Sequence, residues 1–361
     1  MYSIKLYTND FASNLTNLFH SYDFYDFQWR VEINKAGSME FVIPVNHEKA
    51  TATNLALFNK VIVEKDGIGK FIGYIENLQV DTEEIQVKCV GMLGFFEKRL
   101  YTASISSADI DTTMFAILTA TNSAGATGIS NGTSTGVSGA ITSMDFSRSS
   151  VLDAWQKIAN FGDIEFEIDT DRNFNLYTEM GVDKSDSIFL RYNTTQLPTA
   201  TILEFDVEVD GGDMANSVTG IRDGGSTASK TDATSIAAYG LLEESKNFAQ
   251  TANATDLETE TQNYLDTSKN EFYSPKITLN PNYITESDID LGDTVSVQLF
   301  NGFINVDLEE RIIKKTVSVG EDGMETVSLE LLPTTTNKLP STFLDDIVDL
   351  EKRLKLVEGA I

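Results

Sequence analysis

Strict alternation of apolar and polar residues is the feature that most limits what this 361-residue chain can fold into. Every second residue is apolar in FQWRVEI, residues 27 to 33, and SMEFVI, residues 38 to 43, repeats the pattern. A period of two places the apolar side chains on one face of a strand, so each strand has one buried and one solvated face. The segments KVIVEKDG and GKFIGYIENLQV then predict two strands joined by a turn at Asp66-Gly67.

The pattern changes from about residue 101, where helical spacing replaces alternation. Apolar residues recur at helical intervals in IDTTMFAILTATN and SSVLDAWQKIANFG. Between these segments, SAGATGISNGTSTGVSGAIT is rich in Gly, Ser and Thr, which predicts a long surface loop or a weakly ordered hairpin. The stretch DIEFEIDTDRNFNLY that follows predicts a hairpin. Residues 101–200 are therefore expected to form an α/β insert domain.

Alternation returns from residue 201 and continues to residue 333. A strand is predicted in ILEFDVEV, a loop in STASKTDATS and a helix in ATDLETETQNYLDTSKN, followed by strands in SPKITLN, DTVSVQLF, RIIKKTVSV and ETVSLELL. Residues 60–93 and 294–332 share one order of strands and turns. That shared order fits an internal duplication, and it also fits two unrelated antiparallel meanders.

Net charge is the strongest compositional signal, because 55 acidic residues oppose 27 basic ones and give −28. Such a surface repels phosphate, so no specific nucleic-acid binding and no affinity for an anionic membrane are expected. The acidity serves either solubility or a passage through which a polyanion slides. No apolar run approaches the ~20 residues of a membrane-spanning helix, and the start, MYSIKLYTNDF, lacks a secretory pattern. We expect folding in a cytoplasm without stable membrane insertion.

Catalytic and cofactor motifs are scarce. Neither His20 nor His47 lies in a motif that supplies a nucleophile, a base and an orienting acid. No glycine-rich nucleotide loop occurs, and Cys89 falls on the apolar face of a predicted strand. Paired carboxylates for sugar hydrolysis stay open as an alternative, because sequence does not give the separation between acids. We predict no enzyme activity and no cofactor.

One segment begins like a calcium-binding loop. Asp169, Asp171 and Asn173 have the spacing of the first three oxygen ligands. Phe174 then stands where the sharp turn needs glycine, and Met180 stands where the final glutamate should be. We therefore interpret the segment as a polar hairpin turn and predict no metal site.

The C-terminal segment, residues 334–361, ends in FLDDIVDLEKRLKLVEGAI and is the best-defined candidate for oligomerisation. Its apolar residues recur at intervals of four and three: Phe343, Ile347, Leu350, Leu354, Val357 and Ile361. This spacing places them on one stripe of a helix, as in a coiled coil. The alternative is a helix packed on its own chain.

The order of these segments resembles the tail hub proteins of long-tailed bacteriophages, including baseplate hubs and the hub-like part of tail-tip proteins. The residues that carry the resemblance are WRVEINKAGSMEFVIPV, VIVEKDGIGKFIGYIENLQV, IQVKCVGMLGFFEKRL, SVLDAWQKIANFGDIEFEIDTDRNFNLY, ANSVTGIRDG, SIAAYGLLEE and LGDTVSVQLFNGFINVDLEERI. They cover most of residues 25–333.

The resemblance implies an α+β, mainly β fold with two tube-like β-barrel or sandwich domains, an α/β insert and a C-terminal helix. The expected domains are a first barrel at 1–100, the insert at 101–200, a strand-rich region with the second barrel at 201–333, and the helix at 334–361. It also implies a structural protein of the virion tail, assembled in the host cytoplasm.

In that role the chain would form a homotrimer whose barrels make a ring. The ring would join a hexameric tail tube or distal tail protein to a threefold spike or fibre, and would form part of the DNA exit channel. Two alternatives are the hub of a bacterial contractile injection machine and a carbohydrate-active or receptor-binding tail protein.

Overall fold

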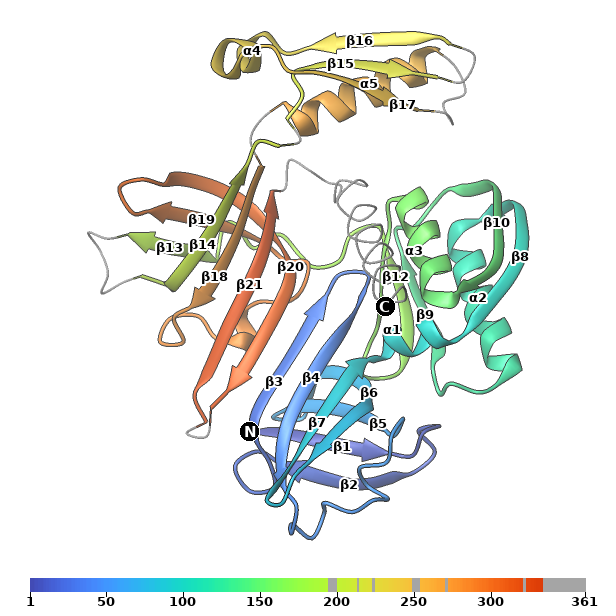
Figure 1. Ribbon diagram of the computed structural model, residues 1–361, viewed down its shortest axis with the longest axis vertical. Helices are drawn as coiled ribbons and strands as arrows, with labels where there is room; N and C mark the ends of the chain where they lie inside the picture. Colours follow the sequence, from blue (N-terminus) through green and yellow to red (C-terminus); the bar gives the residue numbers. More distant parts are fainter. Residues whose placement is uncertain are drawn as a thin grey trace, which may run out of the picture. The chain divides into compact units, whose positions relative to one another are not determined.

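The computed structural model describes residues 1–193, 200–212, 214–222, 225–248, 254–269, 272–320 and 323–333 (Figure 1). By compactness the chain divides into two units. The first unit comprises Met1–Phe205 and Lys276–Leu331, and the second unit includes Asp206–Pro275. Each unit is considered by itself below.

The first unit is built on a sheet of thirteen strands among the described residues. We call β1 to β7 its N-terminal half and the remaining strands its C-terminal half. The N-terminal half contains β1 (Tyr2–Tyr7), β2 (Asn14–Phe19), β3 (Tyr25–Glu32), β4 (Lys35–Pro44), β5 (Lys60–Lys65), β6 (Ile68–Val80) and β7 (Glu84–Gly91). The C-terminal half contains β13 (Phe189–Asn193), β14 (Ile202–Asp210), β18 (Phe272–Leu279), β19 (Thr294–Phe300), β20 (Asn305–Val319) and β21 (Glu325–Pro333).

The strands run in the order β14-β18-β21-β20-β3-β4-β7-β6-β5-β1-β2, with β19 beside β20 and β13 beside β19. The described strands form one open sheet that ends at β2 and β14, so the two expected barrels are halves of a continuous sheet and not closed barrels. The prediction of an α+β, mainly β fold is confirmed.

The alternation predicted from sequence is confirmed in the N-terminal half. Phe27 and Trp29 of β3 are buried, and so are Val87 and Cys89 of β7. The β5–β6 hairpin turns at Asp66-Gly67, where both residues have positive φ as a tight two-residue turn requires.

Each half contains one long strand, β20 or β6, and the two strands differ in how one of their edges is covered. Strand β20 pairs with β19 through Asn305–Arg311 and with β3 through Lys314–Val319, antiparallel in both cases. Strand β6 pairs with β5 only through Ile68–Tyr74, while β7 covers its opposite edge as far as Val80. The halves therefore share the meander orders β5–β6–β7 and β19–β20–β21.

The insert follows a short α-helix α1 (Met92–Phe95) and a 3-10 helix η1 (Phe96–Lys98). Its two predicted helices are confirmed as α2 (Ile110–Ala124) and α3 (Val151–Gly162). Its strands are β8 (Leu100–Asp109), β9 (Ser130–Thr135), β10 (Ala140–Ser150), β11 (Glu165–Ile168) and β12 (Asn173–Tyr177). Trp155 is fully buried in its core, stacked on Phe174 with ring centroids 4.2 Å apart.

The prediction of a loop or hairpin between the two helices is wrong. Strand β9 pairs in parallel with β12, whereas β10 pairs with β8 in a separate ribbon. Backbone pairing and the Asn175 side chain, which accepts the Thr133 N–H at 2.9 Å, hold β9 in place without apolar alternation.

The second unit has a three-stranded sheet in the order β16-β15-β17. Its elements are β15 (Ser217–Ile221), β16 (Thr227–Thr231), α4 (Ala233–Tyr239), β17 (Glu243–Asn247) and α5 (Ala254–Ser268). Leu265 of α5 packs with Ala215 and Val218 in a small core. The helix predicted here is confirmed as α5, but the loop predicted in STASKTDATS is wrong because β16 and α4 occupy it.

Candidate functional site

The junction between the two halves of the sheet is the first candidate site. Strand β20 pairs with β3 so that Val317 lies opposite Trp29 and Val319 lies opposite Phe27. All four side chains are buried. We call this β3–β20 pairing the intrachain junction, and it makes the two halves one continuous sheet.

A buried ion cluster secures the same junction. Glu286, in the 3-10 turn η3 (Glu286–Asp288), has no exposed surface, and its carboxylate lies 2.9 Å from Lys315 Nζ. Lys70 from β6 approaches the same carboxylate at 3.0 Å, and Lys65 from β5 lies 3.6 Å away. The cluster therefore ties the β5–β6 hairpin of one half to the C-terminal half.

Opposing effects set the charge states in this cluster. Burial lowers the pKa of Lys315, and the neighbouring Glu286 carboxylate opposes that shift. Burial alone would raise the pKa of Glu286, but the ammonium groups of Lys315 and Lys70 hold it below its usual range. Lys315 Nζ also donates to the Ile289 carbonyl at 2.7 Å. A buried carboxylate with several cationic partners is costly to disrupt.

A second ion pair fastens the insert to the C-terminal half. The Arg311 guanidinium binds both carboxylate oxygens of Glu165, at 2.5 and 2.6 Å, and donates to the Met180 carbonyl at 2.8 Å. Next to this pair, the backbones of Met180-Gly181 and Gly292 cross so closely that a Cβ on Gly181 would collide with Gly292, and a Cβ on Gly292 would collide with the Met180 carbonyl. Both glycines also have positive φ, which side chains disfavour.

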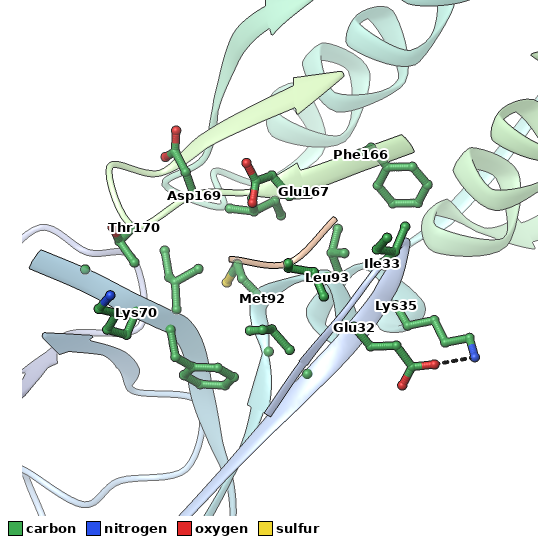
Figure 2. Close-up of a pocket in the computed structure, with 18 of the residues that line it drawn as sticks. Glu32, Ile33, Lys35, Lys70, Met92, Leu93, Phe166, Glu167, Asp169 and Thr170 are labelled. Carbon is green, nitrogen blue, oxygen red and sulfur yellow. Dashed lines mark hydrogen bonds and ion pairs between the residues drawn. The ribbon is translucent and has the colours of Figure 1, made fainter. Parts of the chain in front are cut away.

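A cavity of about 210 Å³ lies where the β11–β12 hairpin of the insert meets the N-terminal half (Figure 2). Its labelled polar side chains come from β3, β4, β6 and the hairpin. Glu32 pairs with Lys35 at 2.5 Å, Lys70 belongs to the ion cluster, and Glu167 accepts from the Tyr177 hydroxyl at 2.8 Å. Burial raises the pKa of Glu167.

The cavity lining serves to attach the insert. Thr170 at the hairpin turn lies directly against Gly69 of β6, where a side chain would not fit. Asp169 accepts the Asn173 N–H at 2.8 Å and the Asn175 amide at 2.8 Å. The interpretation of this segment as a polar hairpin turn is confirmed, and the Asp169 carboxylate is engaged in holding the turn.

The histidines and the cysteine considered in the sequence are buried or paired with neighbouring side chains. His20 is buried, with Nδ1 2.9 Å from the Ser21 hydroxyl, and His47 Nε2 lies 3.2 Å from Asp23. Burial raises the pKa of the Cys89 thiol. In the part of the chain that the structure describes, no acidic, histidine and cysteine side chains group as a metal site, and no helix is long and apolar enough to span a membrane.

The predicted oligomerisation stripe lies outside the described residues. This applies to all six of its members: Phe343, Ile347, Leu350, Leu354, Val357 and Ile361.

Sequence reasoning missed the ion cluster around Glu286. Its one local signal is the Lys314-Lys315 pair, which follows the apolar Ile312-Ile313 in a predicted strand and suggests a buried acidic partner without saying where that partner lies.

Comparison with known proteins shows a likeness in fold. No protein-family model matches this sequence, and no curated protein matches it. Among solved structures, the tail protein from Neisseria meningitidis MC58 aligns with a TM-score of 0.67 and 14% identity, over 92% of this chain and 97% of that one. The prophage tail protein gp18 from Listeria monocytogenes EGD-e aligns with a TM-score of 0.63 and 12% identity, over 98% and 99%.

A third similar structure belongs to a secretion machine. The E. coli c3393 protein is described as a component of the type VI secretion system with structural similarity to the T4 bacteriophage tail proteins gp27 and gp5. It aligns with a TM-score of 0.53 and 10% identity, over 87% of this chain and 74% of that one. The resemblance to tail hub proteins is thus confirmed at the level of the fold.

Proposed function

We propose that this chain is a non-enzymatic structural hub of a phage tail, located in the virion at the baseplate or tail tip. In this role it forms a homotrimer that joins the hexameric tail tube, or a distal tail protein, to a threefold spike or fibre. The observation that carries the proposal is a fold shared over nearly the whole chain with two tail proteins, one of them from a prophage.

The two halves of the sheet support the trimer. Because both halves contain the same meander within one continuous sheet, three chains supply six corresponding halves. Six halves can match a hexameric tube on one side, while the chain itself repeats only three times for a threefold partner on the other. The sheet is thereby suited to a position where the symmetry changes.

The polar face of the sheet supports a place along the DNA exit channel. On this face, Glu40 of β4 lies opposite Lys88 of β7, and Lys314 of β20 pairs with Glu330 of β21 at 2.7 Å. Lys314 is thus paired with an acidic neighbour within the sheet, and the chain as a whole carries −28. Such a surface does not retain a polyanion, which is what passage of DNA requires.

The mass in solution tests the proposal. Light scattering of the purified chain at micromolar concentration should give three times the monomer mass of 39.8 kDa. A monomer under these conditions would contradict the trimer. Direct assays for binding or cleavage of host surface glycans separate this function from a carbohydrate-active or receptor-binding tail protein, because the hub should show neither.

The C-terminal stripe offers a separate test. Substituting Ile347, Leu350 and Leu354 with asparagine should weaken the trimer or abolish attachment of the spike or fibre, because the stripe would lose its apolar contacts. Matched substitutions at Glu351 and Lys352, which lie off the stripe, should change neither. If the stripe variant assembles and binds its partner normally, the helix packs within its own chain.

A hub of a contractile injection machine is the second candidate. The likeness to the type VI secretion component favours it. Isolation of the assembled particle distinguishes the two, because a phage particle contains packaged DNA and an injection machine does not.

A further inference from the structure

The second part of β6 is an open sheet edge. Beyond Tyr74, β5 no longer pairs with β6, while β7 still covers the opposite side through Val80. Among the described strands, none pairs with the open side of residues 76–80. Exposed edges of this kind are templates for pairing with another chain.

The backbone groups on this edge can be assigned from neighbouring hydrogen bonds. The Asp81 N–H donates to the Glu84 carbonyl, so the Asp81–Glu84 pair is hydrogen-bonded toward β7. Because antiparallel pairs alternate, the Val80–Ile85 and Leu78–Val87 pairs are not hydrogen-bonded to β7. Leu78 and Val80 therefore direct their N–H and C=O groups to the open side.

Strand β14 provides a second open edge at the other end of the sheet. It terminates the strand order, with β18 on one side and no described strand on the other. Leu203 on this strand is 50% exposed although it is apolar. Phe205 follows at a period of two and lies 4.9 Å from Tyr192 between ring centroids.

The two open edges correspond to the two strands of the intrachain junction. In the N-terminal half β3 lies outside β4 and β7, and in the C-terminal half β14 lies outside β18 and β21. Likewise, the end of β6 corresponds to the end of β20, and both strands finish in an apolar-polar-apolar run.

Burial differs sharply between the corresponding positions. Val319 at the end of β20 is 3% exposed because β3 covers it, whereas Val80 at the end of β6 is 59% exposed. Leu57 and Phe58, both exposed, adjoin the β6 edge, where the Phe58 N–H donates to the Ile75 carbonyl. The β6 edge thus has the apolar composition of the intrachain junction without its partner strand.

We propose that the open edge of β6, residues 76–80, pairs antiparallel with β14 of a second copy of this chain, repeating the intrachain junction between chains. This inference rests on the proposed trimeric hub and specifies its interface. Charge permits the pairing, because Glu76 on this edge is paired with Lys98 at 3.1 Å, and Asn77 and Gln79 are neutral. They would face Glu204 and Asp206 of β14 without like-charge repulsion.

The proposed interface joins two different surfaces, so it is heterologous. Such an interface cannot make a closed symmetric dimer, but forms a ring when the rotation closes. If each junction turns the sheet by one sixth of a circle, three chains close the ring. Every chain then contributes one intrachain and one interchain junction.

Three single variants of the full chain test the edge. Val80→Lys and Leu203→Lys place a charge where the strands would meet, and each should convert the trimer to monomer by light scattering. Ile68→Lys is the matched control, because Ile68 belongs to the same strand and is 63% exposed but lies at the end paired with β5. It should remain trimeric. All three positions are exposed, so thermal unfolding should change by only a few degrees.

Mixing the two monomeric variants makes the test specific. The Val80→Lys chain keeps an intact β14, and the Leu203→Lys chain keeps an intact β6 edge. An equimolar mixture should therefore form a one-to-one pair and nothing larger, whereas either variant alone stays monomeric. A mixture that stays fully monomeric would overturn the pairing of these two edges.

The outcomes separate this inference from the proposed function. If the wild-type chain is trimeric and both lysine variants remain trimeric, the edge pairing is wrong and the trimeric hub stands. If the wild-type chain is monomeric at micromolar concentration, the trimer and the edge pairing both fail.

Discussion

The two halves of the main sheet share a strand order but fill their cores differently. In the N-terminal half, Phe71 of β6 lies opposite Val63, whereas in the C-terminal half Glu310 of β20 lies opposite Val295. Both side chains are buried, yet neither carboxylate oxygen of Glu310 has a hydrogen-bond partner among the described residues. The shared order therefore does not depend on a shared core composition.

The N-terminal half has its own buried ionisable group. Lys60 of β5 is fully buried, and its Nζ lies 3.7 Å from the ring centroid of Phe95, with no hydrogen-bond partner in the part of the chain described. Burial lowers the pKa of Lys60 to about 8 and raises the pKa of Glu310 to about 8. The N-terminal half thus carries a buried base and the C-terminal half a buried acid, which predicts opposite responses of stability to pH.

The largest expected effect on stability comes from disrupting the ion cluster that links the two halves. Glu286→Ala should lower the free energy of unfolding by about 3–5 kcal/mol, because Lys315 and Lys70 would lose their buried counter-charge. Glu330→Ala is the control, since Glu330 pairs with Lys314 and Lys276 at a partly exposed position and should cost under about 1 kcal/mol. Urea unfolding at neutral pH measures both. Equal losses would show that the cluster does not hold the halves together.

The pH dependence of the unfolding free energy tests the buried Glu310 of the C-terminal half. The folded chain keeps the Glu310 proton up to about pH 8, whereas the unfolded chain releases it near pH ~4.3. The contribution of Glu310 to stability is therefore complete below the unfolded value and is lost as pH rises through this window, by at most about 1.4 kcal/mol per pH unit. The difference between the wild-type and Glu310→Gln unfolding free energies should follow that curve. A difference that is flat from pH 5 to 8 would argue against a protonated Glu310.

The smallest expected effect concerns Lys60 and has the opposite sign. Below about pH 8 the ammonium is charged in both states, so burial costs stability; above that pH the folded chain releases the proton first. Stability should rise between pH 8 and ~10.4 in the wild-type chain. Lys60→Met should remove this rise and add up to about 3 kcal/mol at pH 7, the pKa shift converted at ~1.4 kcal/mol per unit. A Lys60→Met chain that is less stable at pH 7 would show that the Phe95 contact outweighs desolvation.

Local patterns predicted much of the fold. The alternation around Phe27 and Trp29, the Asp66-Gly67 turn and the helical spacing around Trp155 are each confirmed. These signals succeed because the period of apolar residues reports which face is buried. The strands β9 and β16 were missed because SNGTST and TASKT have no apolar alternation and are held by backbone pairing with distant segments.

The candidate site was much less predictable. Glu286 lies in ITESDID, which has the composition of a loop, and its partner Lys70 is more than two hundred residues earlier in the chain. Nothing local distinguishes that acid from the other 54. The order of the strands in space, which creates the open β6 and β14 edges, likewise depends on pairing that no single segment encodes.

One feature of the sheet bears on how such chains diversify. Strands β3 and β4 are joined by only Ile33 and Asn34, and Asn34 accepts the Phe166 N–H of the insert at 2.7 Å. The corresponding strands β14 and β18 are instead joined by residues 211–271, which form most of the second unit and include its core. In evolutionary terms, the first connection is constrained by its contact, whereas the second tolerates large insertions. Homologous chains should therefore differ most in length between β14 and β18, and least between β3 and β4.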